Sequence, residues 1–353
     1  MSPTGRRGRW QTFSTLGVSV SFLGPTPSRR ALVVTSLLGP VAATLSLAPG
    51  RAYAASGTPL GRQVRFGAYA WDVPWTPGVL DDLQRTVQAP VSIASYFYGP
   101  DVVFPAQQDL DTARGGVRDL LVAWEIGKFR YSEWPAGVHD AYLDQIAAAA
   151  RAFPYVMYVR PWPEMNGDWT SFQPTPAGEK EHGGTPEEFI AAWRYLVTYL
   201  RDRGATNLRW VFNPTTDTYE GTTDIRTIYP GDDYVDVLGL DGYNWGNTGL
   251  DWGPWRTFED IYREQYDRLA ALHPTAPVWI CEVGCKEPSY DDGAPRIKSA
   301  SKGRWITDMF AATTFPRVRA VCWFQGNKER DWRVNSSNDA LKAIRSALDQ
   351  MPA

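Results

Sequence analysis

Histidine and cysteine are scarce in this sequence of 353 residues, and the usual cofactor-binding motifs are missing. His139, His182 and His273 have no second ligand at metal-binding spacing, so the sequence predicts no metal site. No G-x-S-x-G elbow, phosphate-binding loop or dinucleotide fingerprint occurs, and we therefore expect no cofactor. The formal net charge of −3 is spread without a basic stripe, which argues against nucleic-acid binding.

The first 54 residues have the pattern of an export signal rather than of a folded domain. The pair Arg29-Arg30 stands before an apolar run at 31–48, and residues 52–54 form a small-x-small cleavage site. Paired arginines indicate the twin-arginine route, so we expect a secreted protein without a stable membrane anchor. A retained N-terminal membrane helix is the alternative. Residues 1–54 are thus expected to be an extension and signal peptide, and residues 55–353 a single, monomeric domain.

From residue 62 onward, short apolar runs alternate with longer segments of helical pattern. Such alternation predicts parallel strands joined by right-handed helical crossovers, and eight repeats favour an α/β fold of the (β/α)8 TIM-barrel class. The strands are expected at 64–70, 90–97, 117–124, 154–160, 207–213, 234–240, 277–282 and 319–324. The clearest helices are expected at 77–88, 138–153, 185–204, 257–273, 302–314 and 338–351, and the segments after the second and fifth strands show no clear pattern.

Two glutamates lie at the ends of predicted strands, where such barrels carry their active sites. Glu164 follows the fourth strand and Glu282 ends the seventh, so we expect them to face each other across the mouth of the barrel. Retaining glycosidases need two carboxyl groups about 5–5.5 Å apart, one to protonate the leaving oxygen and one to attack the anomeric carbon. A single glutamate at a strand end is more often a salt bridge or a rim residue, and only the pair favours this chemistry.

The segments around these glutamates resemble those of glycoside hydrolase family 26, which includes β-mannanases. The segment RPWPEMNGDW is similar to the acid/base signature of that family, Arg-x-x-His-Glu-x-Asn-Gly-x-Trp, and PVWICEVG to its nucleophile strand. VDVLGLDGYNWG resembles its sixth-strand segment and WFQGNKERDWRV its eighth. The implied roles are Glu164 as acid/base, Glu282 as nucleophile, Tyr243 as hydrogen-bond donor to the nucleophile, and Arg160, Asn166, Trp169 and Trp323 as residues of the substrate site.

One position departs from the pattern of the family. Pro163 stands where the family has histidine before the acid/base, and proline offers neither a side-chain donor nor a backbone N–H. A polar contact near the cleavage point is therefore missing or comes from elsewhere, which bears on mannan specificity more than on the type of reaction. Pro163 is also expected to hold Trp162 in extended geometry.

The aromatic content is high, with 16 tryptophans and 17 tyrosines. Some of these rings must fill the core, because indole and phenol groups bury large apolar areas. Others fall in loops at the predicted mouth, where flat rings stack on sugars. Trp71, Trp124 and Trp245, together with Asp241, are further candidates for binding substrate, although any one of them is more often a packing residue.

The three cysteines are expected to be free. Cys281 and Cys322 each precede a residue expected at the mouth, so strand alternation predicts that their side chains point out of the barrel. Neighbouring parallel strands rarely offer disulfide geometry, and Cys285 is expected in the following loop. A Cys285–Cys322 disulfide is the alternative.

Together these patterns predict an enzyme that hydrolyses a β-linked polysaccharide, either mannan or another β-glycan, by double displacement. Its partner would be the polysaccharide or an oligosaccharide alone. Two alternatives use the same barrel: a carbohydrate-binding protein with weak or no activity, and a transglycosylase that passes the glycosyl group to a second sugar.

Overall fold

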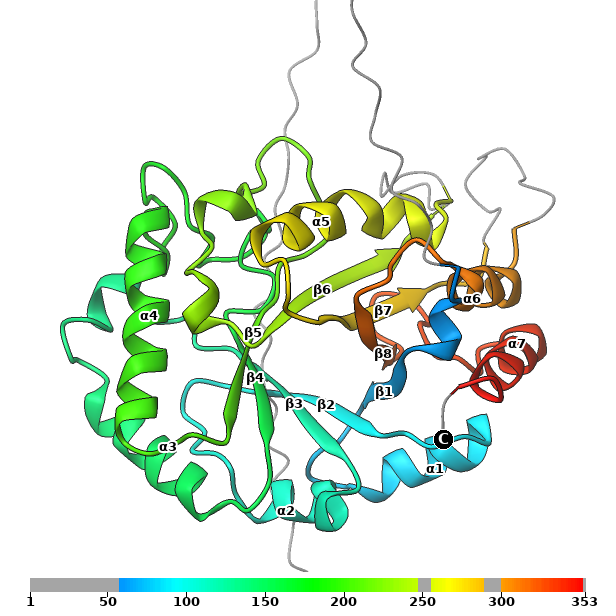
Figure 1. The fold of residues 1–353 in the computed structure, drawn as a ribbon, viewed down its shortest axis with the longest axis horizontal. Coiled ribbons are helices and arrows are strands. Elements are labelled where there is room, and N and C mark those ends of the chain that lie inside the picture. Colours follow the sequence, from blue (N-terminus) through cyan, green and yellow to red (C-terminus); the bar gives the residue numbers. More distant parts are fainter. Residues whose placement is uncertain (1–56, 247–254, 289–299, 352–353) are drawn as a thin grey trace, which may run out of the picture. The chain divides into compact units, whose positions relative to one another are not determined.

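Eight parallel strands close into a barrel in chain order, with β1 paired to both β2 and β8 (Figure 1). The computed structural model describes residues 57–246, 255–288 and 300–351, so the expected signal segment at 1–54 lies outside the described residues. The strands are β1 (Arg65–Ala70), β2 (Ile93–Tyr98), β3 (Asp119–Trp124), β4 (Met157–Pro161), β5 (Leu208–Phe212), β6 (Val237–Asn244), β7 (Val278–Cys285) and β8 (Val318–Gln325). The predicted (β/α)8 barrel and its eight strands are confirmed.

Helices surround the strands on the outside of the barrel (Figure 1). They are α1 (Gly78–Val87), α2 (Gln107–Ala113), α3 (Asp140–Ala152), α4 (Pro186–Asp202), α5 (Phe258–Leu272), α6 (Lys302–Ala311) and α7 (Asn338–Leu348). The six predicted helices are confirmed. The segments after the second and fifth strands, which showed no clear pattern, contain little regular helix. The first holds the short α2, and the second holds the 3-10 turns η4 (Ile225–Thr227) and η5 (Asp232–Tyr234).

Helix α4 shows how local sequence sets the ends of these elements. Thr185 caps its N-terminus: the hydroxyl of Thr185 accepts from the Glu188 amide, and the Glu188 carboxylate accepts from the Thr185 amide at 2.8 Å. Pro186 fits the first helical position because the N–H it lacks has no partner there. The chain leaves the helix at Gly204, whose φ of 82° is left-handed and favours glycine.

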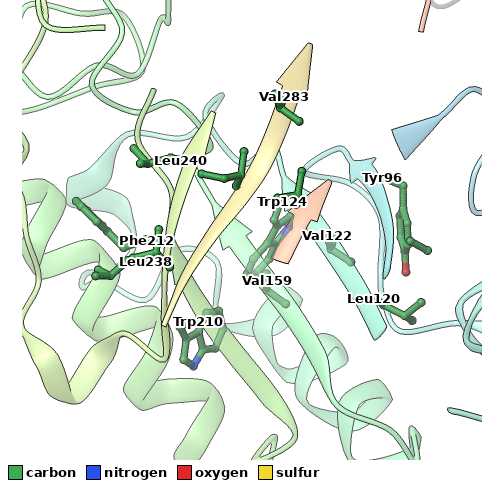
Figure 2. Close-up of a cluster of buried hydrophobic side chains, with 14 of the residues drawn as sticks. Tyr96, Leu120, Val122, Trp124, Val159, Trp210, Phe212, Leu238, Leu240 and Val283 are labelled. Atoms are coloured by element: carbon green, nitrogen blue, oxygen red, sulfur yellow. The ribbon is translucent and has the colours of Figure 1, made fainter. Parts of the chain in front are cut away.

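The hydrophobic core lies mainly between the outer faces of the strands and the helices. Figure 2 shows part of this layer, in which Leu120, Val122 and Trp124 from β3 lie in one buried cluster with Val159 and Leu240. A smaller cluster fills the inside of the barrel and comes from alternate positions of the strands: Ile93, Leu121, Val211, Val237, Trp279, Cys281, Ala320 and Cys322. Both faces of each strand are therefore buried, which explains the nearly continuous apolar runs.

A β-bulge on β7 breaks the alternation of side chains. Leu240 of β6 pairs with Ile280, but the next residue, Asp241, pairs with Glu282, so Cys281 is an extra residue on β7. The Cys281 side chain belongs to the cluster inside the barrel, and Glu282 also turns inward to the mouth. Bulges commonly re-aim side chains in this way next to active sites.

One sequence prediction about the cysteines is wrong, at Cys281 because of the bulge and at Cys322 because its neighbour Trp323 faces the outer core. Cys281 and Cys322 lie inside the barrel and do not point out of it, and Cys285 is the last residue of β7 rather than part of the loop. All three thiols are buried and free, as predicted. Within the described ranges, no helix has the length and apolarity to span a bilayer, and no cluster of potential ligands suits a metal ion.

We predict that denatured, unreduced protein titrates three free thiols, because each sulfur is buried apart from a disulfide partner. The measurement is a colorimetric thiol titration in denaturant, with a fully reduced sample as the control. A count of one free thiol in the unreduced sample would restore the Cys285–Cys322 alternative.

Candidate active site

Glu282 lies at the mouth of the barrel, and both of its carboxylate oxygens have hydrogen-bond donors. Arg160 Nη2 donates to Oε1 at 2.6 Å, and the Tyr243 hydroxyl donates to Oε2 at 2.5 Å. The residue is only 7% exposed. These contacts fix the orientation of the carboxylate and suit it to act as a nucleophile or an electrostatic stabiliser.

Arg160 is a fully buried guanidinium that links three strands beneath the mouth. In addition to Glu282, its Nη1 donates to Asp241 Oδ2 at 2.8 Å and to Asn213 Oδ1 at 2.9 Å. Its own pKa is raised because the neighbouring charges of Asp241 and Glu282 outweigh the effect of burial. Burial raises the pKa of Asp241 well above its ordinary value, while Arg160 opposes this shift. Such a network keeps a charged donor fixed beside Glu282.

Glu164 follows β4 in a turn with unusual backbone geometry. Its φ is 57° and that of Trp162 is 49°, and both values lie in the left-handed region that residues other than glycine rarely adopt. The expectation that Pro163 holds Trp162 extended is therefore wrong. The Trp162 indole packs against Tyr131 and neighbouring rings, and the Glu164 amide donates to Asn213 O at 2.9 Å, so the surroundings impose this turn.

The environment of Glu164 favours a protonated carboxyl group. Burial, and after it the negative charge of Glu282, raise the pKa of Glu164 to about 8. The Trp169 indole N–H, which donates to Oε2 at 3.2 Å, and the charge of Arg160 oppose the shift without reversing it. At neutral pH Glu164 therefore holds a proton, whereas Glu282 is an acceptor of two hydrogen bonds. Two carboxyl groups with such different surroundings are suited to different roles.

Exposed or half-buried aromatic rings lie on the segments that follow β1, β4 and β6. Trp169 is 49% exposed and folds back over Gly167, where a Cβ would lie 2.6 Å from its ring. Trp71, on the segment after β1, is 48% exposed and packs edge-on against Tyr69. Trp245 is half-buried beside Tyr243. These three predicted residues have the exposure that contact with a substrate requires.

Two other predicted platforms are wrong. Trp124 is fully buried in the outer core, where its N–H donates to the Tyr142 hydroxyl at 3.1 Å (Figure 2). Trp323 is also fully buried, and its N–H donates to Trp332 O at 2.7 Å. Both residues have outward positions on their strands, so no face of either ring is open to a sugar. The inward residue at the end of β8 is Phe324, which stacks on Tyr69 with ring centroids 4.5 Å apart.

Three residues expected to bind substrate lie below the surface instead. Arg160, Asp241 and Asn166 are fully buried, so a sugar cannot reach them in this conformation. Asn166 joins the loops after β4 and β5: its side-chain oxygen accepts from the Thr215 amide at 2.8 Å and its amide donates to Thr215 O at 3.2 Å. These three side chains support the site, and their assignment to substrate binding is corrected.

The sequence reading missed Asn213, Tyr69 and Phe324. Asn213 ends the predicted fifth strand, and that position at a strand end was the available signal for its contact with Arg160. Glu125, which follows β3, is a further carboxyl group at the mouth: burial and then the charge of Glu282 raise its pKa. Neighbouring protein atoms surround the Glu125 carboxyl group, but the residue keeps exposed surface that hydroxyl groups of a ligand can reach.

Comparisons with known proteins relate this chain to glycoside hydrolases. The model of the family described as glycosyl hydrolase family 26 matches residues 135–273. Endoglucanase H of Acetivibrio thermocellus is 37% identical over 232 residues, which cover 65% of this chain and 24% of that protein. Mannan endo-1,4-beta-mannosidase of Bacillus subtilis strain 168 is 33% identical over 132 residues, 35% of this chain and 29% of that protein. The chain thus spans less than a third of either relative.

Solved structures show the same fold at lower identity. The catalytic domain of the Bacillus sp. JAMB-750 GH26 endo-beta-1,4-mannanase superposes with a TM-score of 0.58 at 20% identity, covering 83% of this chain and 88% of that one. A Cellulomonas fimi endo-beta-1,4-mannanase double mutant gives 0.54 at 19% identity, covering 83% and 72%.

A (β/α)8 barrel with one carboxyl group after β4, another within β7 and a tyrosine bound to the second is a scaffold of the glycoside hydrolase type. The sequence matches narrow this class further. Residues 135–273 match glycosyl hydrolase family 26, in agreement with the resemblance of the sequence motifs to that family.

We predict that Trp169→Phe moves the alkaline limb of the kcat/KM profile to higher pH. A catalytic acid is active while protonated, so activity falls as pH rises through its pKa, about 8 for Glu164. The Trp169 N–H stabilises the charged form, and its loss raises that pKa further. A hydrogen bond of about 1 kcal/mol corresponds to a shift of roughly 0.7 pH units.

The matched control is Trp75→Phe, because Trp75 is an exposed indole on the segment after β1. Its alkaline limb should coincide with that of the wild type. An unchanged limb in Trp169→Phe, or a shift to lower pH, would show that this N–H does not act on the catalytic acid.

Proposed function

We propose that this protein is a retaining glycoside hydrolase that cleaves a β-linked polysaccharide by double displacement. The observation that carries the proposal is the contrast between the two carboxyl groups. Glu282 accepts hydrogen bonds from Arg160 and Tyr243, whereas the raised pKa of Glu164, about 8, keeps that group protonated at neutral pH. One group is thus prepared to attack and the other to donate a proton.

In the first step, Glu282 attacks the anomeric carbon and Glu164 gives its proton to the departing glycosidic oxygen. The Glu282 carboxylate then carries the glycosyl group, and Glu164 is left as an anion. In the second step Glu164 takes a proton from water, and the hydroxide attacks the anomeric carbon and releases Glu282. Two inversions give net retention. The fixed contact of Tyr243 with Glu282 reduces the motion that the nucleophile needs in either step.

We propose a β-glucan as the preferred substrate rather than mannan. The similarity to a protein named as an endoglucanase spans 232 residues, whereas those to two proteins named as mannosidases span 129 and 132 residues. Pro163 also replaces the histidine of the family pattern with a residue that has no donor. Among the described residues at the mouth, Trp169 supplies an indole N–H, but that donor is bound to Glu164.

The N-terminal pattern supports a further part of the proposal, that the protein is exported by a twin-arginine signal. A polysaccharide too large to enter a cell requires an enzyme outside it.

The central test compares Glu164→Gln and Glu282→Gln on two substrates. On a polysaccharide, both variants should lose at least about a thousandfold in kcat, since each removes a reacting group. On a dinitrophenyl β-glycoside, whose leaving group needs no proton, Glu164→Gln should keep a rapid first turnover and Glu282→Gln should not. The matched control is Glu259→Gln, which changes an exposed glutamate on α5.

Three outcomes separate this proposal from its alternatives. Proton NMR of the first product should show the β-anomer, and an α-anomer would replace retention by inversion. A wild-type protein that binds β-glycans without releasing reducing sugar would be a carbohydrate-binding protein. Longer oligosaccharides as the main product at high sugar concentration would identify a transglycosylase.

We predict that the unmodified enzyme cleaves β-glucan at least about tenfold faster than β-mannan at equal concentration. A missing charge-assisted hydrogen bond of about 1.5–3 kcal/mol corresponds to roughly a ten- to hundredfold loss in rate. Initial rates of reducing-sugar release on both polymers measure the ratio. Vigorous mannan hydrolysis by the wild type would show that the histidine missing at Pro163 is dispensable.

A further inference from the structure

Lys302 is a fully buried lysine at an unfavourable position for a charge. It is the first residue of α6, next to the N-cap Ser301, where the helix dipole is positive. Burial lowers the pKa of Lys302 to about 8, while the nearby groups of Cys285, Glu287 and Asp331 oppose this shift. A buried ammonium at the positive end of a helix costs stability, so its contacts must provide a compensating gain.

Those contacts are with one loop, the segment 326–337 between β8 and α7. Lys302 Nζ donates to Arg333 O at 2.6 Å, to Ser336 Oγ at 2.9 Å and to Asp331 O at 3.3 Å. The three N–H groups of the ammonium thus have three acceptors on the loop. Ser336 in turn donates to Glu287 Oε1 at 2.6 Å, which ties the same turn to the segment after β7.

The charged side chains near the Lys302 ammonium do not replace its hydrogen bonds to the loop. Asp331 and Arg333 pair with each other at 2.7 Å, and their backbone oxygens rather than their side chains face Lys302. The centroid of the Trp323 ring lies 5.9 Å from Lys302 Nζ. The described carboxylates form no ion pair with Lys302, so hydrogen bonding to the loop is its main interaction.

The loop carries Trp332 to the side of Tyr243. Trp332 is 1% exposed, its amide donates to Gly326 O at 3.0 Å, and its carbonyl accepts from the Trp323 indole. The Trp332 and Tyr243 rings have centroids 4.9 Å apart, and the Trp332 ring also meets Trp245 at 4.8 Å. Tyr243 then donates to Glu282. A continuous set of contacts therefore leads from Lys302 through Trp332 and Tyr243 to the nucleophile.

We propose that Lys302 is a positioning residue, which holds the segment 326–337 so that Trp332 fixes Tyr243 against Glu282. The expected effect of Lys302 on catalysis rests on the proposed function. Its expected effect on the order of the segment 326–337 does not. Lys302 touches neither the substrate nor the reacting atoms. Its role is to keep the Tyr243 hydroxyl on Glu282 through both steps of the reaction.

The structural consequence is tested by hydrogen exchange followed by mass spectrometry. Lys302→Met keeps an apolar chain of similar length but removes all three donors, and it should speed exchange in peptides that cover 326–337 at least about tenfold. Ser336→Ala removes one acceptor and should give a smaller change in the same peptides, even if Lys302→Met fails to fold. Lys342→Met, an exposed lysine on α7, is the matched control and should match the wild type.

The kinetic consequence is tested by a double-mutant cycle with Tyr243→Phe on the preferred β-glycan. We expect Lys302→Met to lower kcat about tenfold with little change in KM, and to lower it less than about twofold when Tyr243 is already phenylalanine. A merely structural role would reduce activity by the same factor in both backgrounds.

The outcomes separate the two proposals. Unchanged exchange in 326–337 for both Lys302→Met and Ser336→Ala, or an additive cycle, would overturn the role of Lys302. Absence of glycosidase activity in the wild type would reject the proposed function, and the exchange comparison would still decide whether Lys302 orders the loop.

Discussion

The active site depends on one buried cation shared between two carboxylates. Arg160 donates to Glu282 and to Asp241 from the centre of the barrel, and neither Arg160 nor Asp241 has any exposed surface. A guanidinium buried in this way requires carboxylate partners, and those partners come from β6 and β7 on the far side of the barrel. Because β4, β6 and β7 belong to one closed barrel, the backbone positions that carry these side chains are fixed relative to one another.

The position of the nucleophile depends on a local departure from sheet geometry. In a regular strand, consecutive residues face opposite sides, so Cys281 and Glu282 could not both point inward. The extra residue on β7 changes the phase of the strand, so that Cys281 fills the interior while Glu282 reaches Arg160 and Tyr243. The left-handed turn at Trp162 and Glu164 does the same for the other carboxyl group, at the expense of backbone strain. Both glutamates are thus held where regular secondary structure would not place them.

Buried groups on both sides of Glu282 connect the protonation of Glu164 with the packing of the loops at the mouth. The pKa of Glu164 is high because of burial and the nearby charge of Glu282, so in the proposed reaction the nucleophile also tunes the acid/base. On the other side of Glu282, Tyr243 packs against Trp332, whose loop is bound to Lys302. Catalytic residues on loops at a barrel mouth need such support, because loops have few contacts of their own.

The sequence by itself determined the eight strands and most helices, because apolar periodicity and cap residues act over short distances. It also placed Glu164, Tyr243 and Glu282 on or next to β4, β6 and β7, although β6 and β7 extend to Asn244 and Cys285, three or four residues beyond the predicted ends. It also indicated the resemblance to glycosyl hydrolase family 26, since the matching motifs are local. Only the tertiary structure decided which side of a strand or loop several side chains face. Trp323 and Trp124 face the outer core, Cys281 faces the inside of the barrel, and Asn166 and Asp241 are buried. Facing depends on register, and one extra residue reverses it for every position that follows. The bulge on β7 arises from pairing with both neighbouring strands, which no local pattern encodes.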